Sequence, residues 1–165
     1  MPTLLTREQA LERIRGEVGR PSCLMCALRD RVTRVFELED EGDVLVLCPR
    51  FVRMFGHIVV MPRPHCVTYG EVDAALWARV DARALHAARV VERVQNPRRV
   101  YLASTGSAAG ELTQSSVHLH VHVLPIDDPN ARPADVFSWS DGIWEQSDEE
   151  LEAVRDAYRA EWARI

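Results

Sequence analysis

One short segment constrains the fold of this chain more than any other. From position 118 to position 122 every second residue is a histidine, and the residues between them are apolar. Successive side chains of a β-strand point to opposite faces, so the alternation predicts a strand over residues 117–124. We expect His118, His120 and His122 on one face of that strand and the intervening apolar residues in a core.

Three adjacent imidazoles cannot all carry a charge without strong mutual repulsion, so some of them are expected to be neutral. A neutral imidazole nitrogen can act as a nucleophile or as a metal ligand. The pattern alone therefore leaves open a phosphate-attacking site, a metal site and, least favoured, an incidental histidine-rich face.

The rest of the chain predicts a mixture of strands and helices. Further strands are expected over residues 34–39, 44–48, 56–61 and 100–103, and helices over residues 6–17, 72–95 and 147–162. Strands paired as a meander, with one long helix inserted and others at the ends, indicate an α+β domain with a mainly antiparallel sheet. No linker or repeat interrupts the sequence, so we expect a single domain over residues 1–165.

Charge and hydropathy exclude several classes of function. The net charge of −5 offers no basic surface for duplex nucleic acid, although a small nucleotide remains an acceptable partner. Residues 1–20 are charged and lack the apolar centre of a signal peptide. No apolar run reaches the ~20 residues of a membrane span. We therefore expect a cytoplasmic protein without a membrane partner.

Two of the four cysteines form a pair. Cys23 and Cys26 have the C-x-x-C spacing, which in a reducing compartment favours metal binding or redox chemistry over a structural disulfide. Cys48 and Cys66 stand alone in apolar stretches and are expected to be small buried hydrophobic residues.

Four motifs together resemble the histidine triad (HIT) superfamily. They are His118-Leu-His120-Val-His122-Val-Leu, Gly56-His57-Ile-Val-Val-Met-Pro62-x-x-His65, Gln114-Ser115 and Cys23-x-x-Cys26. They follow the family's usual order over residues 23–125, and residues 126–165 form a C-terminal tail and helix outside the motifs. The cysteine pair resembles the zinc-carrying bacterial branch. The resemblance implies the HIT-like α+β fold and a homodimer whose sheets join across a two-fold axis.

The resemblance also implies a role for each residue of the active site. His120 would be the nucleophile that attacks the α-phosphorus of a nucleotide, and His122 would hydrogen-bond the phosphate oxygens or the leaving group. Gln114 and Ser115 would donate to the same oxygens, and His57 would line the phosphate pocket.

A structural zinc is implied beside the active site. In the zinc-bearing members, the cysteine pair, an upstream histidine and the first histidine of the triad form a tetrahedral site. The corresponding residues here are Cys23, Cys26, His65 and His118, with His57 as the alternative to His65.

The implied activity is that of a nucleotide hydrolase that works through a covalent nucleotidyl-histidine. Its candidate substrates are nucleoside phosphoramidates, aminoacyl adenylates and dinucleoside polyphosphates. The alternatives are a nucleotidyltransferase and a weakly catalytic nucleotide- or partner-binding module. The weakly catalytic binding module gains support because Pro49 stands where the family usually has a ribose-binding acid. Arg50, Arg53 and Arg63 remain candidate phosphate contacts.

Overall fold

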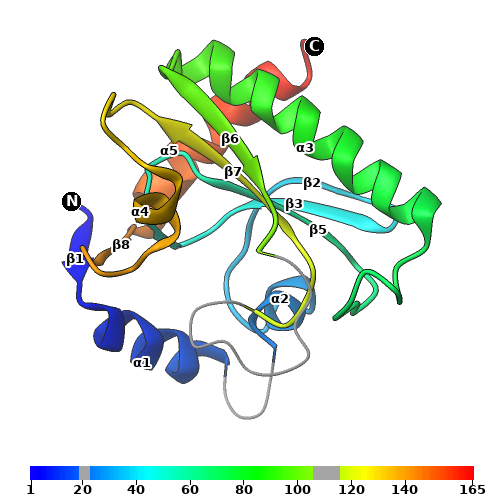
Figure 1. Ribbon diagram of the computed structural model, residues 1–165, viewed down its shortest axis with the longest axis horizontal. Coiled ribbons are helices and arrows are strands. Elements are labelled where there is room, and N and C mark those ends of the chain that lie inside the picture. The colour runs from blue at the N-terminus through cyan, green and yellow to red at the C-terminus, as the bar shows by residue number, and fades with distance from the viewer. Residues whose placement is uncertain (19–22, 106–115) are drawn as a thin grey trace.

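A five-stranded antiparallel sheet lies at the centre of the computed structural model, which describes residues 1–18, 23–105 and 116–165 (Figure 1). In spatial order its strands are β2 (Phe36–Glu41), β3 (Val44–Cys48), β5 (Ile58–Pro62), β7 (Val121–Ile126) and β6 (Arg99–Ala103). Every pair of neighbouring strands is antiparallel. The expected α+β class with an antiparallel sheet is confirmed.

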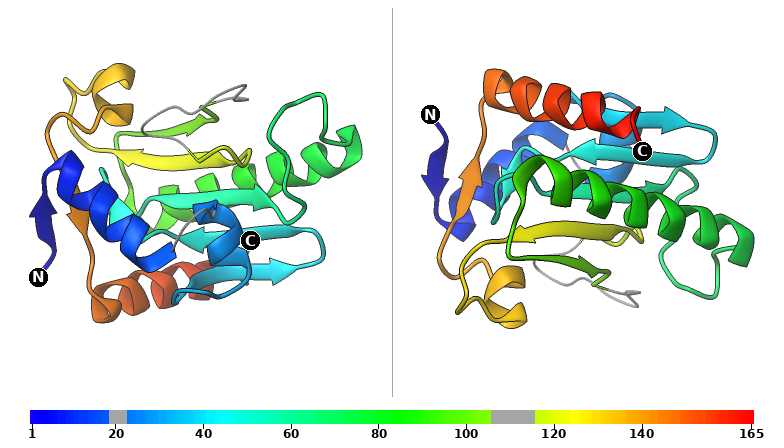
Figure 2. Two further views of the ribbon diagram at one scale, coloured as in Figure 1. Left: turned by 90° about the horizontal axis from the view of Figure 1, so that it is seen from below. Right: turned by 90° about the horizontal axis from the view of Figure 1, so that it is seen from above.

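Helices cover both faces of this sheet. The long α3 (Ala74–Gln95) and the C-terminal α5 (Asp148–Trp162) lie on one face, and α1 (Arg7–Val18) and α2 (Leu24–Arg29) lie on the other (Figure 2). The short α4 (Pro133–Phe137) follows β7. Among the described residues, no helix is long and apolar enough to cross a membrane.

Two helix starts expected from the sequence have the predicted caps. The hydroxyl of Ser147 accepts from the backbone N–H of Glu150, whose carboxylate accepts from the N–H of Ser147, and Thr6 and Gln9 make the same reciprocal pair before α1. Each pair satisfies two backbone donors that a helix leaves free at its N-terminus. These local bonds explain why α1 and α5 begin where the sequence predicts.

A second, three-stranded sheet was not expected. It has the order β1 (Thr3–Leu5), β8 (Ile143–Glu145) and β4 (Phe51–Val52). Strands of two or three residues are too short to show an alternating pattern. This sheet joins both ends of the chain to the segment that precedes His57.

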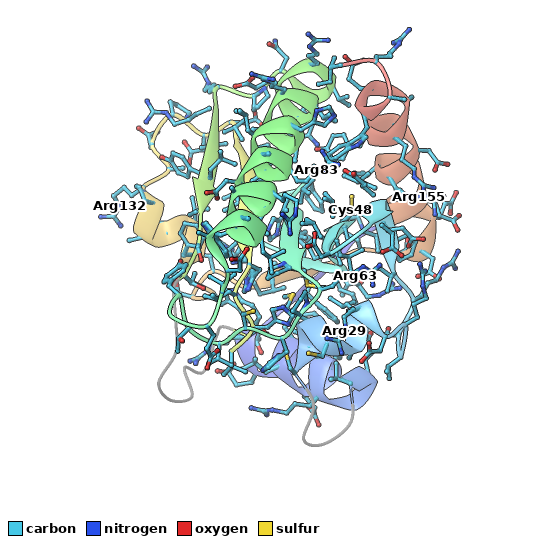
Figure 3. All side chains as sticks on the ribbon, turned by 90° about the vertical axis from the view of Figure 1, so that its right-hand side faces the viewer. Arg29, Cys48, Arg63, Arg83, Arg132 and Arg155 are labelled. Atoms are coloured by element: carbon cyan, nitrogen blue, oxygen red, sulfur yellow. The ribbon has the colours of Figure 1, made fainter. Side chains whose placement is uncertain are left out.

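The main core lies between the central sheet and the helices α3 and α5. The expected apolar stripe of α3 is buried there; it consists of Leu76, Val80, Ala84, Ala88 and Val91. Cys48 and Cys66 are 3% and 6% exposed, as expected of small apolar residues. Figure 3 shows the sulfur of Cys48 among the side chains of this core, whereas Arg63 forms an ion pair with Asp40.

The strand that carries the histidines is shorter than the sequence predicted. It starts at Val121 rather than near residue 117, so of the three histidines only His122 belongs to it. Pairing with β5 ends at Val121, and the N–H of Leu119 donates instead to the carbonyl oxygen of Cys66. The reason is the end of β5: Pro62 and Pro64 lack the N–H groups that would extend the ladder. Residues 118–120 therefore leave the sheet and contact residues 62–66.

Candidate active site and metal cluster

His57, His122 and His120 form a chain of hydrogen-bond contacts at β5 and β7. The Nε2 of His120 lies 3.0 Å from the Nε2 of His122, and the Nδ1 of His122 lies 2.9 Å from the Nε2 of His57. His57 immediately precedes β5, where Val59 pairs with His122 across the two strands. The sheet register therefore brings together two histidines that are 65 positions apart in the sequence.

The backbone determines which nitrogen of His120 carries the lone pair. Its Nδ1 lies 2.7 Å from the carbonyl oxygen of His118. A carbonyl can only accept, so the hydrogen sits on Nδ1 and the lone pair of the neutral ring sits on Nε2. It follows that His122 donates to His120 through its Nε2–H, and that His57 donates to the Nδ1 of His122. The neutral chain thus has one consistent set of hydrogen positions.

Burial keeps these imidazoles neutral. It is the main cause that lowers the pKa of His57 to about 3, and the nearby His120 adds to the effect. Burial likewise lowers the pKa of His122 and of His120 below the usual value of about 6.5. The rings of His57, His120 and His122 therefore remain neutral side by side at neutral pH. For His120 and His122 this agrees with the expectation that some histidines of the alternating segment are neutral.

The histidines open onto a pocket that is mostly apolar. His57, His120 and His122 line it together with apolar side chains of α2, β3 and β5. Phe137, the last residue of α4, and Trp139, which follows that helix, also line the pocket, and the rings of Phe137 and His122 are 5.7 Å apart. An apolar pocket with a few convergent polar groups is the usual form of a small-molecule site.

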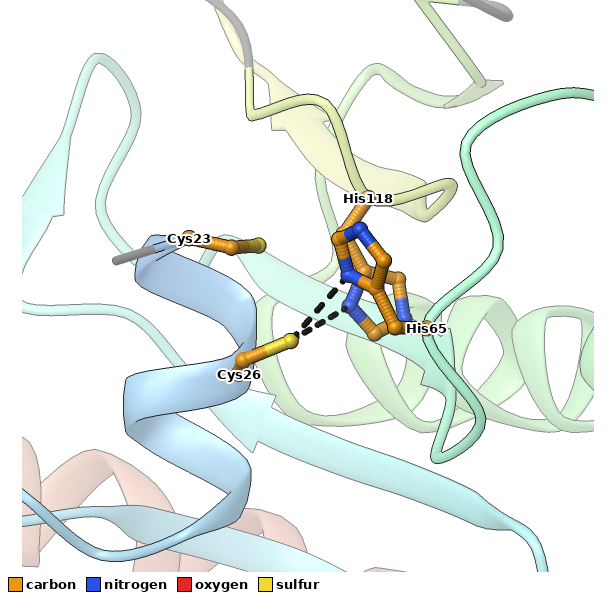
Figure 4. A group of neighbouring side chains, drawn as sticks. All are labelled: Cys23, Cys26, His65 and His118. Atoms are coloured by element: carbon orange, nitrogen blue, oxygen red, sulfur yellow. Dashed lines mark hydrogen bonds between the residues drawn. The ribbon is translucent and has the colours of Figure 1, made fainter. Parts of the chain in front are cut away.

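A cluster of two cysteines and two histidines lies beside this pocket (Figure 4). The ligand-type atoms of Cys23, Cys26, His65 and His118 all lie within 4.8 Å of one another. The Sγ of Cys26 is 3.1 Å from the Nδ1 of His65 and 3.6 Å from the Nδ1 of His118. A tetrahedral zinc with ordinary bond lengths separates sulfur and nitrogen ligands by about 3.5 Å.

The orientation of His118 also suits a metal. Its Nε2 lies 2.8 Å from the carbonyl oxygen of Pro62 and therefore donates to it, which leaves the Nδ1 lone pair directed at the cluster. Histidine ligands commonly donate their other N–H to such a carbonyl. Both the donor set and the second hydrogen bond of His118 fit structural zinc.

The two thiols differ in acidity. Burial raises the pKa of Cys23, but the neighbouring side chains of His118 and Ser116 favour the thiolate and lower that pKa to about 6. Burial and the adjacent Cys23 raise the pKa of Cys26 to about 11. A metal that binds both sulfurs as thiolates would displace a proton from Cys26, so its affinity should depend on pH.

The remaining candidates are two residues ahead of the triad and three arginines, of which Arg63 is paired with Asp40. Gln114 and Ser115 lie outside the described residues. Arg50 lines the pocket but is held by Asp148 and by the carbonyl oxygen of Gln146. Arg53 also lines the pocket and donates to the carbonyl oxygen of Gly142.

Sequence reasoning assigned no role to three residues that the structure places at the site. Phe137 and Trp139 line the pocket, and Ser116 lies at its edge beside Cys23. Little in the sequence singles them out. An aromatic residue in a C-terminal tail is more often a packing residue, and Ser116 belongs to none of the motifs, although it lies only two positions before His118.

Comparison with known proteins identifies the family. The sequence profile of the HIT domain matches residues 32–128. This chain belongs to the HIT family. Membership supports an activity of the nucleotide-binding or nucleotide-hydrolase type in general. The matched range contains the three histidines of the triad and His57, and it begins after the cysteine pair.

Relatives of this HIT protein are distant in sequence. An uncharacterized 16.1 kDa HIT-like protein of Mycoplasma pneumoniae is 26% identical over 105 residues, which are 63% of this chain and 71% of the relative. Among solved structures, a hypothetical histidine triad nucleotide-binding protein of Sulfolobus tokodaii has a TM-score of 0.68 at 19% identity, covering 86% of this chain and 93% of its own. A zinc-bound histidine triad family protein of Mycobacterium smegmatis has a TM-score of 0.65 at 21% identity, with 87% and 94% covered. At these identities the likeness shows that the HIT fold is shared.

Proposed function

We propose that this protein is a nucleotide hydrolase in which His120 attacks the α-phosphorus and forms a covalent nucleotidyl-histidine. The observation that carries the proposal is the hydrogen bond from the Nδ1 of His120 to the carbonyl oxygen of His118. It leaves a lone pair on the Nε2, in the pocket. Membership in the HIT family supports the same class of activity.

The two half-reactions follow from this geometry. In the first, a bond forms between the Nε2 of His120 and phosphorus while the bond to the leaving group breaks. The imidazole ring becomes positively charged, and its Nδ1–H bond to the carbonyl oxygen becomes charge-assisted and stronger. In the second, a water oxygen bonds to phosphorus, the bond to the Nε2 breaks, and the water loses a proton, which balances the proton that the leaving group gains. Dividing one displacement into two easier steps lowers each barrier.

The other residues would hold the phosphate. The Nε2–H of His122 donates to the nucleophilic nitrogen of His120, and with substrate bound it would donate instead to a phosphate oxygen or to the leaving group. His57 would keep His122 in that tautomer. Gln114 and Ser115 are proposed as further donors to the phosphate oxygens. Fixed donors of this kind each contribute ~3 to 4 kcal/mol to the stabilisation of transition-state charge.

The substrate is proposed to be a nucleoside phosphoramidate, an aminoacyl adenylate or a dinucleoside polyphosphate. All three place an α-phosphorus between a nucleoside and a leaving group. Besides the histidines, the pocket is lined by residues of α2 and by Phe137 and Trp139, which lie far apart in the sequence. A lining made by several separate segments supports a substrate that carries a group on each side of the reacting phosphorus.

A covalent adduct is the direct test. The protein is incubated with each of the three substrate classes, quenched at alkaline pH, and its intact mass is measured. Wild type is expected to gain the mass of one nucleotidyl group, and His120→Ala to gain none and to lose at least about a thousandfold in kcat/KM, equal to about 4 kcal/mol. His86→Ala, a histidine of α3 that contacts Trp162, is the matched control and should behave as wild type. Activity of His120→Ala within about tenfold of wild type would sink the proposal.

The same experiment separates the alternatives. A nucleotidyltransferase would form the adduct but pass the nucleotide to an added sugar phosphate faster than to water. A non-catalytic module would bind the nucleotide and form no adduct. Pro49 stands where the family usually has a ribose-binding acid, and the neighbouring Arg50 already donates to the carbonyl oxygen of Gln146. For this reason the non-catalytic module stays among the alternatives that the experiment tests.

We also propose a structural zinc and a homodimer. Cys23, Cys26, His65 and His118 would bind one zinc ion, which would hold α2 against the segments that follow β5 and precede β7.

In the dimer the β6 edges of two sheets would meet, and Leu102 on that edge is 47% exposed. Sedimentation of wild type and of Leu102→Glu tests the dimer, and the expected result is a shift of the variant to monomer.

A further inference from the structure

A serine hydroxyl connects two members of the Cys/His cluster. The Oγ of Ser116 lies 3.3 Å from the Sγ of Cys23, and it is 3.4 Å from the backbone nitrogen of His118. The N–H of His118 can only donate, so the serine oxygen accepts that bond. The single hydrogen of the hydroxyl is then left for the sulfur of Cys23.

We propose that Ser116 is a positioning residue of the metal centre, whose hydroxyl donates to the Cys23 thiolate and holds it as a ligand. The inference rests on the zinc site proposed above. It does not depend on hydrolase activity. The ligand class is a divalent cation that accepts two thiolates and two imidazoles, for which zinc is the ordinary case.

The arrangement of the cluster explains why this cysteine requires a support. Cys26 contacts both imidazoles, at 3.1 and 3.6 Å. Cys23 lies immediately before α2, whereas Ser116 and His118 lie on the segment that leads into β7. The bond from Ser116 therefore crosses between two segments 93 positions apart and fixes the distance between a cysteine ligand and a histidine ligand.

The hydroxyl also acts on the charge of the sulfur. A donor to a metal-bound thiolate offsets part of its negative charge and orients its lone pairs. Outer-shell partners of this kind typically change metal affinity by about 10- to 100-fold. Ser116 lines the substrate pocket as well, in common with His120, so the same side chain borders the metal centre and the active site.

Metal affinity of three substitutions tests the role of the hydroxyl. Ser116→Ala removes it, Ser116→Thr keeps it, and Ser116→Val has the shape of threonine without it. Ser140→Ala, an exposed serine that hydrogen-bonds Ser138, is the control. Zinc affinity is measured by competition with a chromophoric chelator, and Co²⁺ is added separately to record the thiolate-to-cobalt charge-transfer band.

The alanine and valine variants are expected to bind zinc about 10- to 100-fold more weakly than wild type, and the threonine variant within about threefold. The charge-transfer band of the alanine and valine variants should shift in wavelength, because the Cys23 thiolate has lost a hydrogen bond. The bands of the threonine and control variants should stay at the wild-type wavelength. If the alanine variant does not fold, the threonine and valine variants decide the question by themselves.

Three outcomes would overturn the inference. Alanine and valine variants with wild-type affinity and spectrum would show that the hydroxyl has no effect. A threonine variant as weak as the valine variant would show that packing matters and hydrogen bonding does not. A wild-type protein that binds neither zinc nor Co²⁺ would remove the metal site itself. Failure of the hydrolase proposal would appear separately, as the absence of the covalent adduct on His120.

Discussion

At the scale of single residues, the chemistry of this protein depends on the direction of a few hydrogen bonds. A backbone carbonyl at position 118 orients His120, and a second carbonyl at position 62 orients His118. The two histidines are only two positions apart, yet one presents its Nε2 to the pocket and the other its Nδ1 to the cysteines. Opposite tautomers allow neighbouring residues of one motif to serve different sites.

The low pKa of His57 predicts a dependence of stability on pH. In the folded protein this pKa is about 3, and in the unfolded chain it returns to about 6.5. Between these values the unfolded state binds the extra proton, so stability is fully present above about pH 6.5 and is lost as the pH falls toward 3. One such group contributes a slope of at most about 1.4 kcal/mol per pH unit.

Denaturant unfolding of wild type and His57→Leu between pH 7 and pH 4.5 measures this slope. The variant should be less stable at pH 7, because the Nδ1 of His122 loses its donor, and the difference from wild type should shrink by about 1 kcal/mol per unit below pH 6. The metal cluster is the same in both proteins, so its own pH dependence cancels. Parallel curves would contradict the prediction.

At the scale of elements, the cluster of Cys23, Cys26, His65 and His118 joins three segments that the sheet does not hold together. They are the start of α2, the residues after β5 and the residues before β7. Residues 118–120 have left the ladder, so strand pairing does not support them. A metal bound there would stabilise the fold through a cross-link between distant parts of the chain.

We therefore expect metal removal to lower the melting temperature by several degrees, because 1 kcal/mol corresponds to roughly 2 to 4 °C in a domain of this size. Differential scanning fluorimetry with and without a strong chelator measures the shift. Cys23→Ser should melt like chelated wild type and should not respond to the chelator. Cys66→Ala, a buried cysteine outside the cluster, should remain sensitive. An equal chelator response from Cys23→Ser and wild type would argue against the site.

Helix α5 supports the candidate active site from the opposite face of the sheet. The hydroxyl of Tyr158 donates to the carbonyl oxygen of Gly56 at 2.9 Å, immediately before His57. Gly56 has a φ of 84°, and a Cβ there would lie closer than 3 Å to the side chains of Gln95 and Tyr158. A glycine is required at this position for both reasons.

Removing that support should cost stability. Tyr158→Phe leaves a buried carbonyl without its donor, and the free energy of unfolding is expected to fall by about 1 to 3 kcal/mol. Gly56→Ala should cost more than 1 kcal/mol, because it adds backbone strain and a clash. Urea unfolding measures both. Gly42→Ala is the control for the conformational part alone, since its φ is 60° but no atom lies within 4 Å of the added Cβ. Equal losses for the two glycine variants would show that the contacts of Gly56 do not matter.

At the scale of the whole molecule, both ends of the chain join the structure that holds the site. Strand β1 pairs with β8, and β8 pairs with β4, which leads directly toward His57. Helix α5 packs against α3 in the main core. We propose on this basis that residues 1–165 are a single domain.

A single domain should unfold in one step. Tryptophan fluorescence reports on Trp77 of α3 and on Trp139, Trp144 and Trp162 of the C-terminal region, and far-ultraviolet circular dichroism reports on all helices. We expect the two signals to give one coincident denaturation curve. An early fluorescence transition that left the helical signal unchanged would mean that the C-terminal region unfolds separately.

Much of the fold could be predicted because its signals are local. The apolar stripe of α3, the caps at Thr6 and Ser147, and the apolar runs of β3 and β5 all appear within a few consecutive residues. The three-stranded sheet escaped prediction because its strands are too short to carry a pattern. The start of β7 was misplaced because the end of a strand depends on whether a neighbouring strand still offers partners, which the strand's own residues do not record.

By itself the sequence determined the reactive side chains, which are the alternating histidines and the cysteine pair. It also determined the antiparallel α+β fold class and the HIT family. Spacing carries this information because period and residue type are properties of the chain. Only the tertiary structure decided which protonation state and which neighbours each of these side chains has. Contacts with Pro62 and His118 carbonyl oxygens set the tautomers of His118 and His120, burial makes the imidazoles neutral, and the sheet register brings His57 to His122. Hydrogen-bond direction and desolvation depend on neighbours that are distant in sequence, so they exist only once the chain has folded.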